Sequence, residues 1–254
     1  MKTHTLEKTK NKDLFRVVDL EGNWQNYLHQ PSGRYLKGVT TILDRGYAKG
    51  AFFNNWLLSK SKEEADKILQ TAGDRGDKVH KAIAKLLETK GKIDFKTFTV
   101  QDPETKIETL LNVDEWKCLL SFARFWNDHA CIVMAQEFPL FSLKQGFAGT
   151  CDAAVAITKP CDNKRCQCPN FVKSLGLWDW KTSGAIYASY GCQIAAYNEA
   201  ENLLEYTKVK PKYTANLRLG TKHNSGYELV IYDAKETKNH WHEFLSAKMI
   251  ASGF

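Results

Sequence analysis

The sequence predicts a mixed α and β fold, in which a central mixed sheet formed by residues 132–183 is flanked by helices. Two segments within this region, 151–157 and 177–181, alternate in the way that β-strands do. An amphipathic helical segment at 114–131 precedes them, and a second helical segment at 189–205 follows. No internal repeat or long linker interrupts the 254 residues, so we expect a single domain.

The composition is that of an ordinary folded protein, with 43% hydrophobic and 26% charged residues. The excess of 36 Lys and Arg over 29 Asp and Glu, a net charge of +7, favours a polyanionic partner, although a solvated surface gives the same excess. No apolar run reaches the ~18 residues that a membrane span requires, and the N-terminal residues lack the apolar core of a signal peptide. We therefore expect a soluble intracellular protein with no membrane partner. The oligomeric state does not follow from the sequence.

The N-terminal part reads as a small sheet behind a polar arm. Residues 1–13 are polar and lysine-rich, which predicts a mobile arm. Residues 14–20 and 24–28 predict a hairpin around a turn at 21–23. After the hairpin, Thr40 or Thr41 is expected to cap a short helix.

Helical segments follow the N-terminal hairpin and complete the region 14–131. Residues 51–60 carry Phe52, Phe53 and Trp56 at helical spacing, which suits packing, with base stacking as the alternative. The sequence Ser61-Lys62-Glu63-Glu64 is a capping box that starts a helix, in one or two pieces, ending near Thr89. Residues 91–111 look irregular.

The core is expected at residues 132–235. A strand at 132–142 contains Glu137, and a turn at 144–146 leads into the strand that contains Asp152. Two more alternating strands are predicted at 213–219 and 227–233. The C-terminal region 236–254 is a predicted helix from Glu236 to Ala251, one side of which carries Trp241, Phe244, Leu245, Lys248 and Met249.

Charged side chains in these strands indicate a chemical site. On a strand, Asp179 and Lys181 point to one face, while Trp178 and Trp180 point to the other. If the strand of Asp152 lies alongside, two carboxylates and one ammonium group meet. Carboxylates that converge repel each other unless a cation intervenes, and their oxygens suit Mg²⁺ or Mn²⁺. Such a metal beside a lysine is suited to phosphodiester hydrolysis.

The order of these motifs resembles that of the RecB-like branch of the PD-(D/E)XK nuclease superfamily. The matching residues are Gly149-x-x-Asp152, then Asp179-x-Lys181 followed by Thr-Ser, then Gln193-x-x-x-Tyr197, with His80 in an upstream helix. The segment 38–43, followed by a tryptophan-bearing helix, is similar to exonuclease-type members from phages and from mitochondrial genome maintenance. The resemblance covers roughly residues 38–235.

The resemblance implies a restriction-endonuclease-like αβββαβ core with an N-terminal hairpin and helical cover. It implies metal ligation by His80, Asp152, Asp179 and the carbonyl of Trp180, with Lys181 acting on the attacking water. Gln193 is then expected to hold the lysine, and Tyr197 to meet a substrate phosphate or a metal-bound water. Glu137 either assists the metal centre or forms a surface salt bridge. Products with a 5′-phosphate and a 3′-hydroxyl are implied.

The resulting functional prediction is a Mg²⁺- or Mn²⁺-dependent deoxyribonuclease without a nucleotide cofactor. An exonuclease acting on DNA ends, single-stranded in preference, is the first choice, and a flap endonuclease is the alternative within the same class. A non-catalytic DNA-binding accessory protein is the alternative from another class. Arg75 and Lys78 either contact phosphate or are solvated surface charges. A recombination or single-strand-binding protein is the expected protein partner, in a host cytoplasm if a phage encodes the chain.

The seven cysteines are an odd number in a chain expected to be intracellular, which argues against a disulfide framework. Cys161, Cys166 and Cys168 cluster between the two strands that carry Asp152 and Asp179. They predict either a polar loop with free thiols, a Zn²⁺ site with Cys151 or Cys192 as fourth ligand, or an iron–sulfur cluster. The late cysteines that hold a cluster in some RecB-like nucleases have no counterpart after Cys192.

Overall fold

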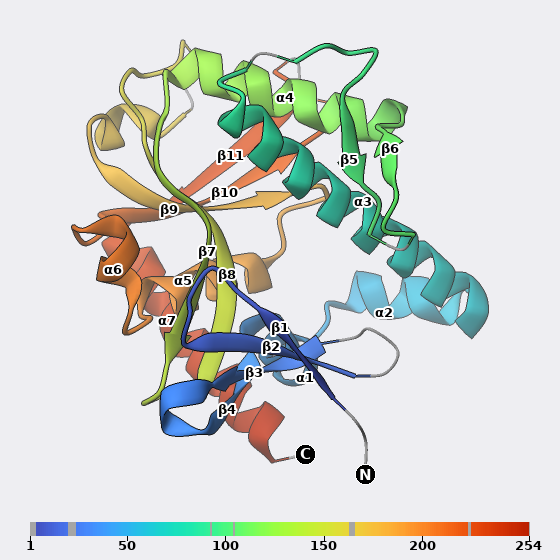
Figure 1. The fold of residues 1–254 in the computed structure, drawn as a ribbon, viewed down its shortest axis with the longest axis vertical. Helices are drawn as coiled ribbons and strands as arrows, with labels where there is room; N and C mark the ends of the chain where they lie inside the picture. The colour runs from blue at the N-terminus through green and yellow to red at the C-terminus, as the bar shows by residue number, and fades with distance from the viewer. Residues whose placement is uncertain are drawn as a thin grey trace.

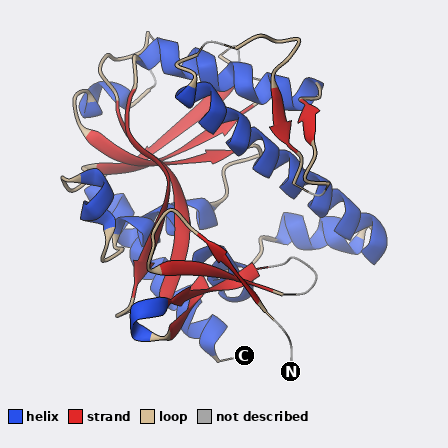
Figure 2. Ribbon diagram, in the orientation of Figure 1, coloured by secondary structure: helices blue, strands red, loops and turns tan. Residues whose placement is uncertain are grey.

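The computed structural model describes residues 4–19, 24–91, 93–103, 105–162, 166–222 and 225–253. Its strands and helices are shown in Figures 1 and 2. The strands are β1 (Thr5–Lys8), β2 (Leu14–Val18), β3 (Trp24–His29), β4 (Arg34–Gly38), β5 (Thr99–Gln101), β6 (Glu108–Leu110), β7 (Ile132–Ser142), β8 (Phe147–Ala156), β9 (Leu175–Lys181), β10 (Tyr213–Leu219) and β11 (Tyr227–Tyr232). The α-helices are α1 (Val39–Gly46), α2 (Ala51–Leu58), α3 (Lys62–Glu88), α4 (Val113–His129), α5 (Ala188–Asn198), α6 (Leu203–Thr207) and α7 (Ala234–Ser252).

Nine of the described strands form one mixed sheet. Its order is β1-β2-β3-β4-β8-β9-β10-β11, and β7 pairs with β8 off this path. Strands β7, β8 and β9 are successively antiparallel, whereas β9 and β10 are parallel and are connected through α5 and α6. The predicted class, a mixed sheet flanked by helices, is therefore confirmed.

Strand β8 is the point at which the sheet divides. Because β7 occupies one edge of β8 from Phe147 to Ala156, strands β4 and β9 share the other edge. Strand β4 pairs with residues 147–148, and β9 pairs with residues 153–156. Residues 149–152 lie between the two partners and pair with neither. The sheet is thus open at the fork formed by residues 149–152, and Asp152 lies in it.

The two faces of the sheet are covered by different helices, as Figure 1 shows. On one face, Phe122 and Phe125 of α4 pack on Trp180 and Trp178, with ring centroids 5.2 and 5.3 Å apart. On the other face, α1, α5 and α7 enclose a second apolar core that includes Leu177. This arrangement follows from the alternation in β9, which directs Trp178 and Trp180 to α4 and directs Leu177 and Asp179 to α5.

Helix α3 is one continuous helix of 27 residues. The Ser61 hydroxyl accepts a hydrogen bond from the Glu64 backbone N–H at 3.2 Å, so the predicted helix start is confirmed. Val79, Ala82, Ile83 and Leu86 are buried against α4 and the sheet. The burial of this stripe fixes the rotation of α3, and thereby aims the neighbouring His80 at the fork.

Several local predictions were wrong. Residues 5–8 form β1, which pairs with β2, instead of belonging to a mobile arm. The irregular stretch 91–111 contains the β5–β6 hairpin. The segment 189–205 breaks into α5 and α6. Strands β1, β5 and β6 have only three or four residues each, and each pairs with a strand close to it in the chain. Segments this short show little of the alternation by which strands are predicted.

The ends and faces of two helices also differ from the prediction. Helix α1 begins at Val39 after Gly38, so Thr40 and Thr41 lie inside it and do not cap it. In α7, Met249 is 77% exposed, although the sequence predicts it on the same side of the helix as Phe244, which is buried.

The aromatic residues of α2 pack in part on each other. The rings of Phe53 and Trp56 have centroids 5.6 Å apart. The side chain of Phe52 and the predicted turn at 21–23 lie outside the described residues. Within the described residues, no helix has the length and apolar character needed to cross a membrane.

Gly149 allows the close packing at the fork. A Cβ atom there would lie 2.6 Å from a ring carbon of Tyr197, which is buried. We expect Gly149→Ala to destabilise the fold by about 1–3 kcal/mol, because the rigid ring has no space to retreat. Gly73→Ala is the matched control, because a Cβ at this exposed position of α3 meets nothing within 4 Å. It should stabilise the protein by up to about 1 kcal/mol through helix propensity.

Denaturant unfolding measures the change in the free energy of unfolding for both variants, which should be a loss for Gly149→Ala and a gain for Gly73→Ala. Equal stability of Gly149→Ala and wild type would show that Tyr197 is free to move.

Candidate active site where strands β8 and β9 part

Side chains from five elements converge at the fork of β8. These are His80 from α3, Glu137 from β7, Asp152 from β8, Asp179 and Lys181 from β9, and Gln193 from α5. Strands β8 and β9 lie next to each other as the sequence predicted, with Ala153 opposite Trp178. The side chains beyond this pair face the gap that the two strands leave as they separate.

His80 and Asp152 are held together with the backbone of β9. The Nδ1 atom of His80 lies 3.2 Å from Oδ1 of Asp152, and its Nε2 atom lies 3.0 Å from the carbonyl oxygen of Trp180. The backbone N–H of Trp180 donates to Oδ2 of Asp152 at 2.6 Å. Trp180 pairs with Leu217 of β10 but has no partner in β8, and the Asp152 carboxylate takes the place of that missing partner.

Glu137 lies opposite Asp152 across the β7–β8 pair, because Gln136 pairs with Ala153 and Phe138 with Cys151. Its φ is +48°, a left-handed conformation that is uncommon outside glycine. One ligand atom from each of His80, Glu137 and Asp152 can be chosen so that all three lie within 4.8 Å of one another. This grouping favours participation of Glu137 at the site over a surface salt bridge.

Asp179 is 1% exposed and is held by three side chains. Its Oδ2 atom lies 2.7 Å from Nζ of Lys181, and the Asn216 amide donates to the same oxygen at 3.0 Å. Gln193 donates to Oδ1 at 3.1 Å and accepts a hydrogen bond from Lys181 at 2.9 Å. Gln193 therefore contacts the lysine in the way that the resemblance implies. Asp179 is not part of the group of His80, Glu137 and Asp152, whose ligand atoms lie within 4.8 Å of one another.

The pKa shifts of the site residues reflect both burial and the charges of the neighbouring carboxylates and cations. Burial, together with the charge of Asp152, raises the pKa of Glu137 to about 7 and that of Asp179 to about 6, despite the lowering effect of Lys181 on Asp179. Burial lowers the pKa of His80, but Asp152, Glu137 and Asp179 outweigh this effect and raise it to about 9. Protons thus compensate carboxylates that lie too close together, and a divalent cation would compensate them as well.

Tyr197 lies in the interior of the protein. It is 2% exposed, and its ring packs against Gly149. The Gln193 amide nitrogen lies 3.5 Å from its hydroxyl. The contact of Tyr197 with a substrate phosphate or a metal-bound water stays a prediction. Tyr197 supports Gln193 and fills the fork from the α5 side.

The two predicted phosphate contacts differ from each other. Arg75 is half-buried and donates to the carbonyl of Thr182 at 3.0 Å, directly after Lys181, so it borders the site. Lys78 is 8% exposed, lies 3.3 Å from the Glu115 carboxylate and donates to the carbonyl of Leu110 at 3.1 Å. Lys78 is therefore not a solvated surface charge, whereas its predicted contact with phosphate stays a prediction. It is an internal ion-pair partner that ties α3 to α4.

Sequence reasoning missed several residues at the site. Asn216 lies opposite Asp179 in the β9–β10 pair, and its signal was a lone amide in the buried strand Tyr213–Leu219. Tyr190 places its ring 4.4 Å from Nζ of Lys181, and it shares a helix face with Gln193. Lys10 donates to the carbonyl of Gln136 at 3.1 Å, beside Glu137, a long-range contact with no local signal.

The cysteine prediction needs one correction. Cys161 and Cys168 bring their sulfur atoms within 3.5 Å of each other, but Cys151 and Cys192 are buried in the core on the opposite face of the sheet. Neither can be the fourth ligand of a site at the Cys161–Cys168 loop. All seven cysteines are described, and all are free.

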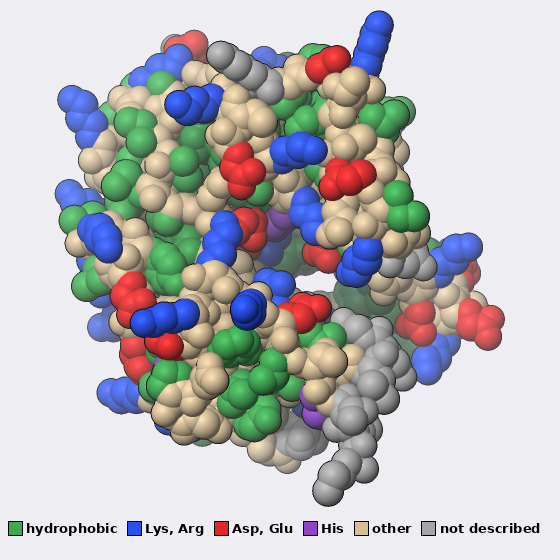
Figure 3. Space-filling view, viewed as in Figure 1, with side chains coloured by type: hydrophobic (Ala, Val, Ile, Leu, Met, Phe, Trp, Pro, Cys, Tyr) green, Lys and Arg blue, Asp and Glu red, His purple; other side chains and the backbone are tan. Residues whose placement is uncertain are grey.

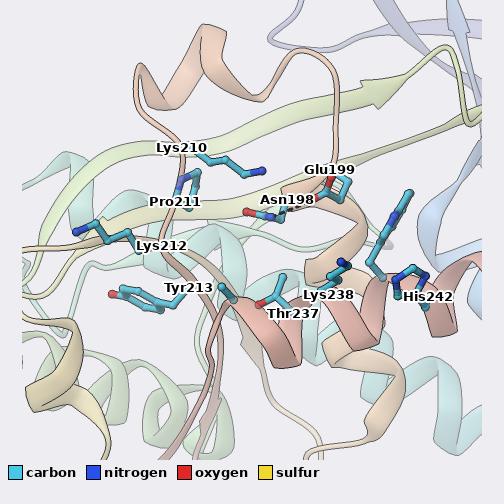
Figure 4. A pocket seen from close by; sticks show the side chains of 11 residues that line it. Asn198, Glu199, Lys210, Pro211, Lys212, Tyr213, Thr237, Lys238 and His242 are labelled. Carbon is cyan, nitrogen blue, oxygen red and sulfur yellow. Dashed lines mark hydrogen bonds between the residues drawn. The ribbon is translucent and has the colours of Figure 1, made fainter.

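The surface is hollowed near the middle of the face shown in Figure 3, between α3 and the N-terminal strands β1 and β2. Acidic, basic and histidine side chains surround this hollow. A separate pocket of about 370 Å³, shown in Figure 4, is lined by Lys210, Lys212 and Lys238 among others and contains none of the predicted site residues. Lys210 and Lys212 point in different directions there, so they do not converge on one ligand.

Comparisons with known proteins do not place the chain in a family. No protein-family model matches it, and no curated protein matches it.

The buried pair of Lys78 and Glu115 gives a stability prediction. Lys78→Met should cost about 3–5 kcal/mol, because it leaves the Glu115 carboxylate buried without its counter-charge. Lys78→Met/Glu115→Gln should recover most of this loss, because glutamine keeps the contact that Glu115 makes with the backbone N–H of Asn112. Denaturant unfolding measures the three proteins. An unchanged stability of the single variant would show that Lys78 is not an internal partner.

Proposed function

We propose that this protein is a metal-dependent nuclease that hydrolyses phosphodiester bonds in DNA, with an exonuclease acting on DNA ends as the favoured form. The observation that carries the proposal is the convergence of His80, Asp152, Asp179 and Lys181 from three separate elements at the fork of β8. The order β7, β8, β9, α5, β10, with its antiparallel and parallel pairs, also supports a restriction-endonuclease-like core.

The donor atoms at the fork fit a divalent metal. Asp152, Glu137 and Asp179 offer carboxylate oxygens and Trp180 offers its carbonyl oxygen, as hard cations require. His80 contributes a nitrogen, and it already lies within 3.2 Å of Asp152 and 3.0 Å of the Trp180 carbonyl. A nitrogen ligand shifts the preference toward Mn²⁺ relative to Mg²⁺. When bound, the metal would activate water and neutralise the charge that develops on the phosphate.

The remaining side chains position the reacting groups. Lys181 is held by Asp179 and Gln193 at 2.7 and 2.9 Å, so its ammonium is fixed where it can donate to the attacking water or to a phosphate oxygen. Tyr190 covers the ammonium with its ring. Arg75 of α3 donates to the carbonyl of Thr182, and Lys10, between β1 and β2, donates to the carbonyl of Gln136. Both cations therefore border the site. These cations are suited to the DNA backbone.

Metal binding can be measured apart from catalysis. We expect Mn²⁺, and more weakly Mg²⁺, to raise the unfolding temperature, with a stabilisation of about 2.7 kcal/mol when the free ion is at 100 times its dissociation constant. Asp152→Asn should abolish this gain, because it removes one charged ligand. Asp44→Asn, which changes an exposed carboxylate paired with Lys49, should keep it. A gain of equal size in both variants would place the metal elsewhere.

Activity should require the same residues. Full-length protein is incubated with end-labelled single-stranded, double-stranded and circular DNA, in Mn²⁺, Mg²⁺ or EDTA. We expect metal-dependent degradation of linear DNA with circles spared. Lys181→Met and Asp152→Asn should each lose about 10²–10⁴-fold in rate, whereas Asp44→Asn should match the wild type.

The outcomes separate the alternatives. Cutting of circular DNA would establish an endonuclease, and the label released first gives the polarity of an exonuclease. Binding of DNA without cleavage under any metal would overturn the proposed catalysis and support a non-catalytic DNA-binding protein.

A further inference from the structure

A second group of metal-ligating side chains lies at the end of α4, on the tryptophan face of the sheet. One ligand atom each from His129, Cys161, Cys166 and Cys168 can be chosen so that all four lie within 4.8 Å of one another. Three sulfurs and one nitrogen are a ligand set of structural zinc sites. The sequence suggested the three cysteines, but only the fold brings His129 to them.

One ring nitrogen of His129 lies within 4.8 Å of the sulfur atoms of Cys161, Cys166 and Cys168. The side chain is fully buried, and its Nδ1–H donates to the carbonyl of Phe125 at 3.0 Å. Its Nε2 atom is also buried and has no hydrogen-bond partner. Metal-bound histidines have this arrangement, in which the second ring nitrogen donates to a carbonyl or a carboxylate.

The sulfur atoms are arranged by the backbone of their own loop. The Sγ atoms of Cys161 and Cys168 are 3.5 Å apart, near the about 3.8 Å that a tetrahedron with Zn–S bonds of about 2.3 Å requires. The Cys161 N–H points to the sulfur of Cys168, and the Cys168 N–H points to the sulfur of Cys166, each at 3.4 Å. Backbone N–H groups aimed at sulfur hold the sulfur atoms in defined positions, as the hydrogen-bond partners of metal ligands do.

Backbone hydrogen bonds also connect His129 to the segment that leads to the three cysteines, without a metal. The backbone N–H groups of Thr158 and Lys159 both donate to the carbonyl of His129 at 3.2 Å. The connection between β8 and β9 is therefore attached to the C-terminal end of α4, so the four ligands are brought together before an ion binds. Such preorganisation lowers the cost of forming the site.

We propose that His129, Cys161, Cys166 and Cys168 form a structural Zn²⁺ site. With four protein ligands, the site has no open position for a substrate, which makes it structural and not catalytic. It ties α4, whose Phe122 and Phe125 pack on Trp180 and Trp178, to the segment that leads into β9. The zinc thereby supports the strand of Asp179 and Lys181 from the face opposite to Gln193. This proposal stands without the proposed nuclease activity.

The test is metal analysis of the full-length protein purified under reducing conditions, with zinc and iron measured per chain. We expect about one zinc ion per chain, with loss of zinc in Cys161→Ser and in His129→Ala. Cys131→Ala is the matched control, because Cys131 is also buried and is close in sequence to His129 but lies outside the group. It should keep its zinc.

Cobalt substitution of the wild type avoids variants that fail to fold. Co²⁺ should give the intense sulfur-to-metal charge-transfer bands of a thiolate site, and Asp152→Asn should keep them because the carboxylate site has no sulfur ligand. A folded wild type that contains no zinc and gives no such bands with Co²⁺ would overturn the proposal. Iron with inorganic sulfide, or a disulfide between two of the three cysteines in the reduced preparation, would also overturn it.

Discussion

The structure depends on one constraint at strand β8, which has to pair with two different strands along a single edge. Along this edge, pairing with β4 ends at Ala148 and pairing with β9 begins at Ala153, so residues 149–152 have no partner strand there. The Asp152 carboxylate satisfies the freed N–H of Trp180, and Tyr197 fills the space above Gly149. An opening in a sheet leaves backbone groups without a partner strand. Here, Asp152 satisfies such a group and is also a residue of the candidate active site.

Placing these groups together concentrates negative charge, and the surrounding residues offset it. Asp179 is almost fully buried, but Lys181, Gln193 and Asn216 give its oxygens partners. His80 in turn lies against Asp152 and the Trp180 carbonyl. A buried network of this kind is stable only when its members are satisfied. The raised pKa values of Glu137 and Asp179 show that protons complete the compensation where no cation is bound.

Strand β9 is supported from both faces, and the two supports have different chemistry. On the α5 side, polar contacts hold Asp179 and Lys181 in a defined geometry. On the α4 side, Phe122 and Phe125 pack on Trp180 and Trp178 and hold the strand against the helix. The cluster of His129 with three cysteines lies at the end of α4, so it bears on the same strand. The position of a catalytic lysine would thus depend on residues far from the fork.

The sequence by itself determined the strands that carry Asp152 and Asp179, the face shared by Asp179 and Lys181, and the start of α3 at Ser61, because periodicity and capping are local properties. Only the tertiary structure decided that Lys78 is an internal ion-pair partner and that Tyr197 is buried. It also brought Asn216 to Asp179 at the fork, and His129 to the three cysteines. These outcomes depend on which distant elements pack together. Local periodicity does not encode the partner of a side chain, because that partner lies on another part of the chain.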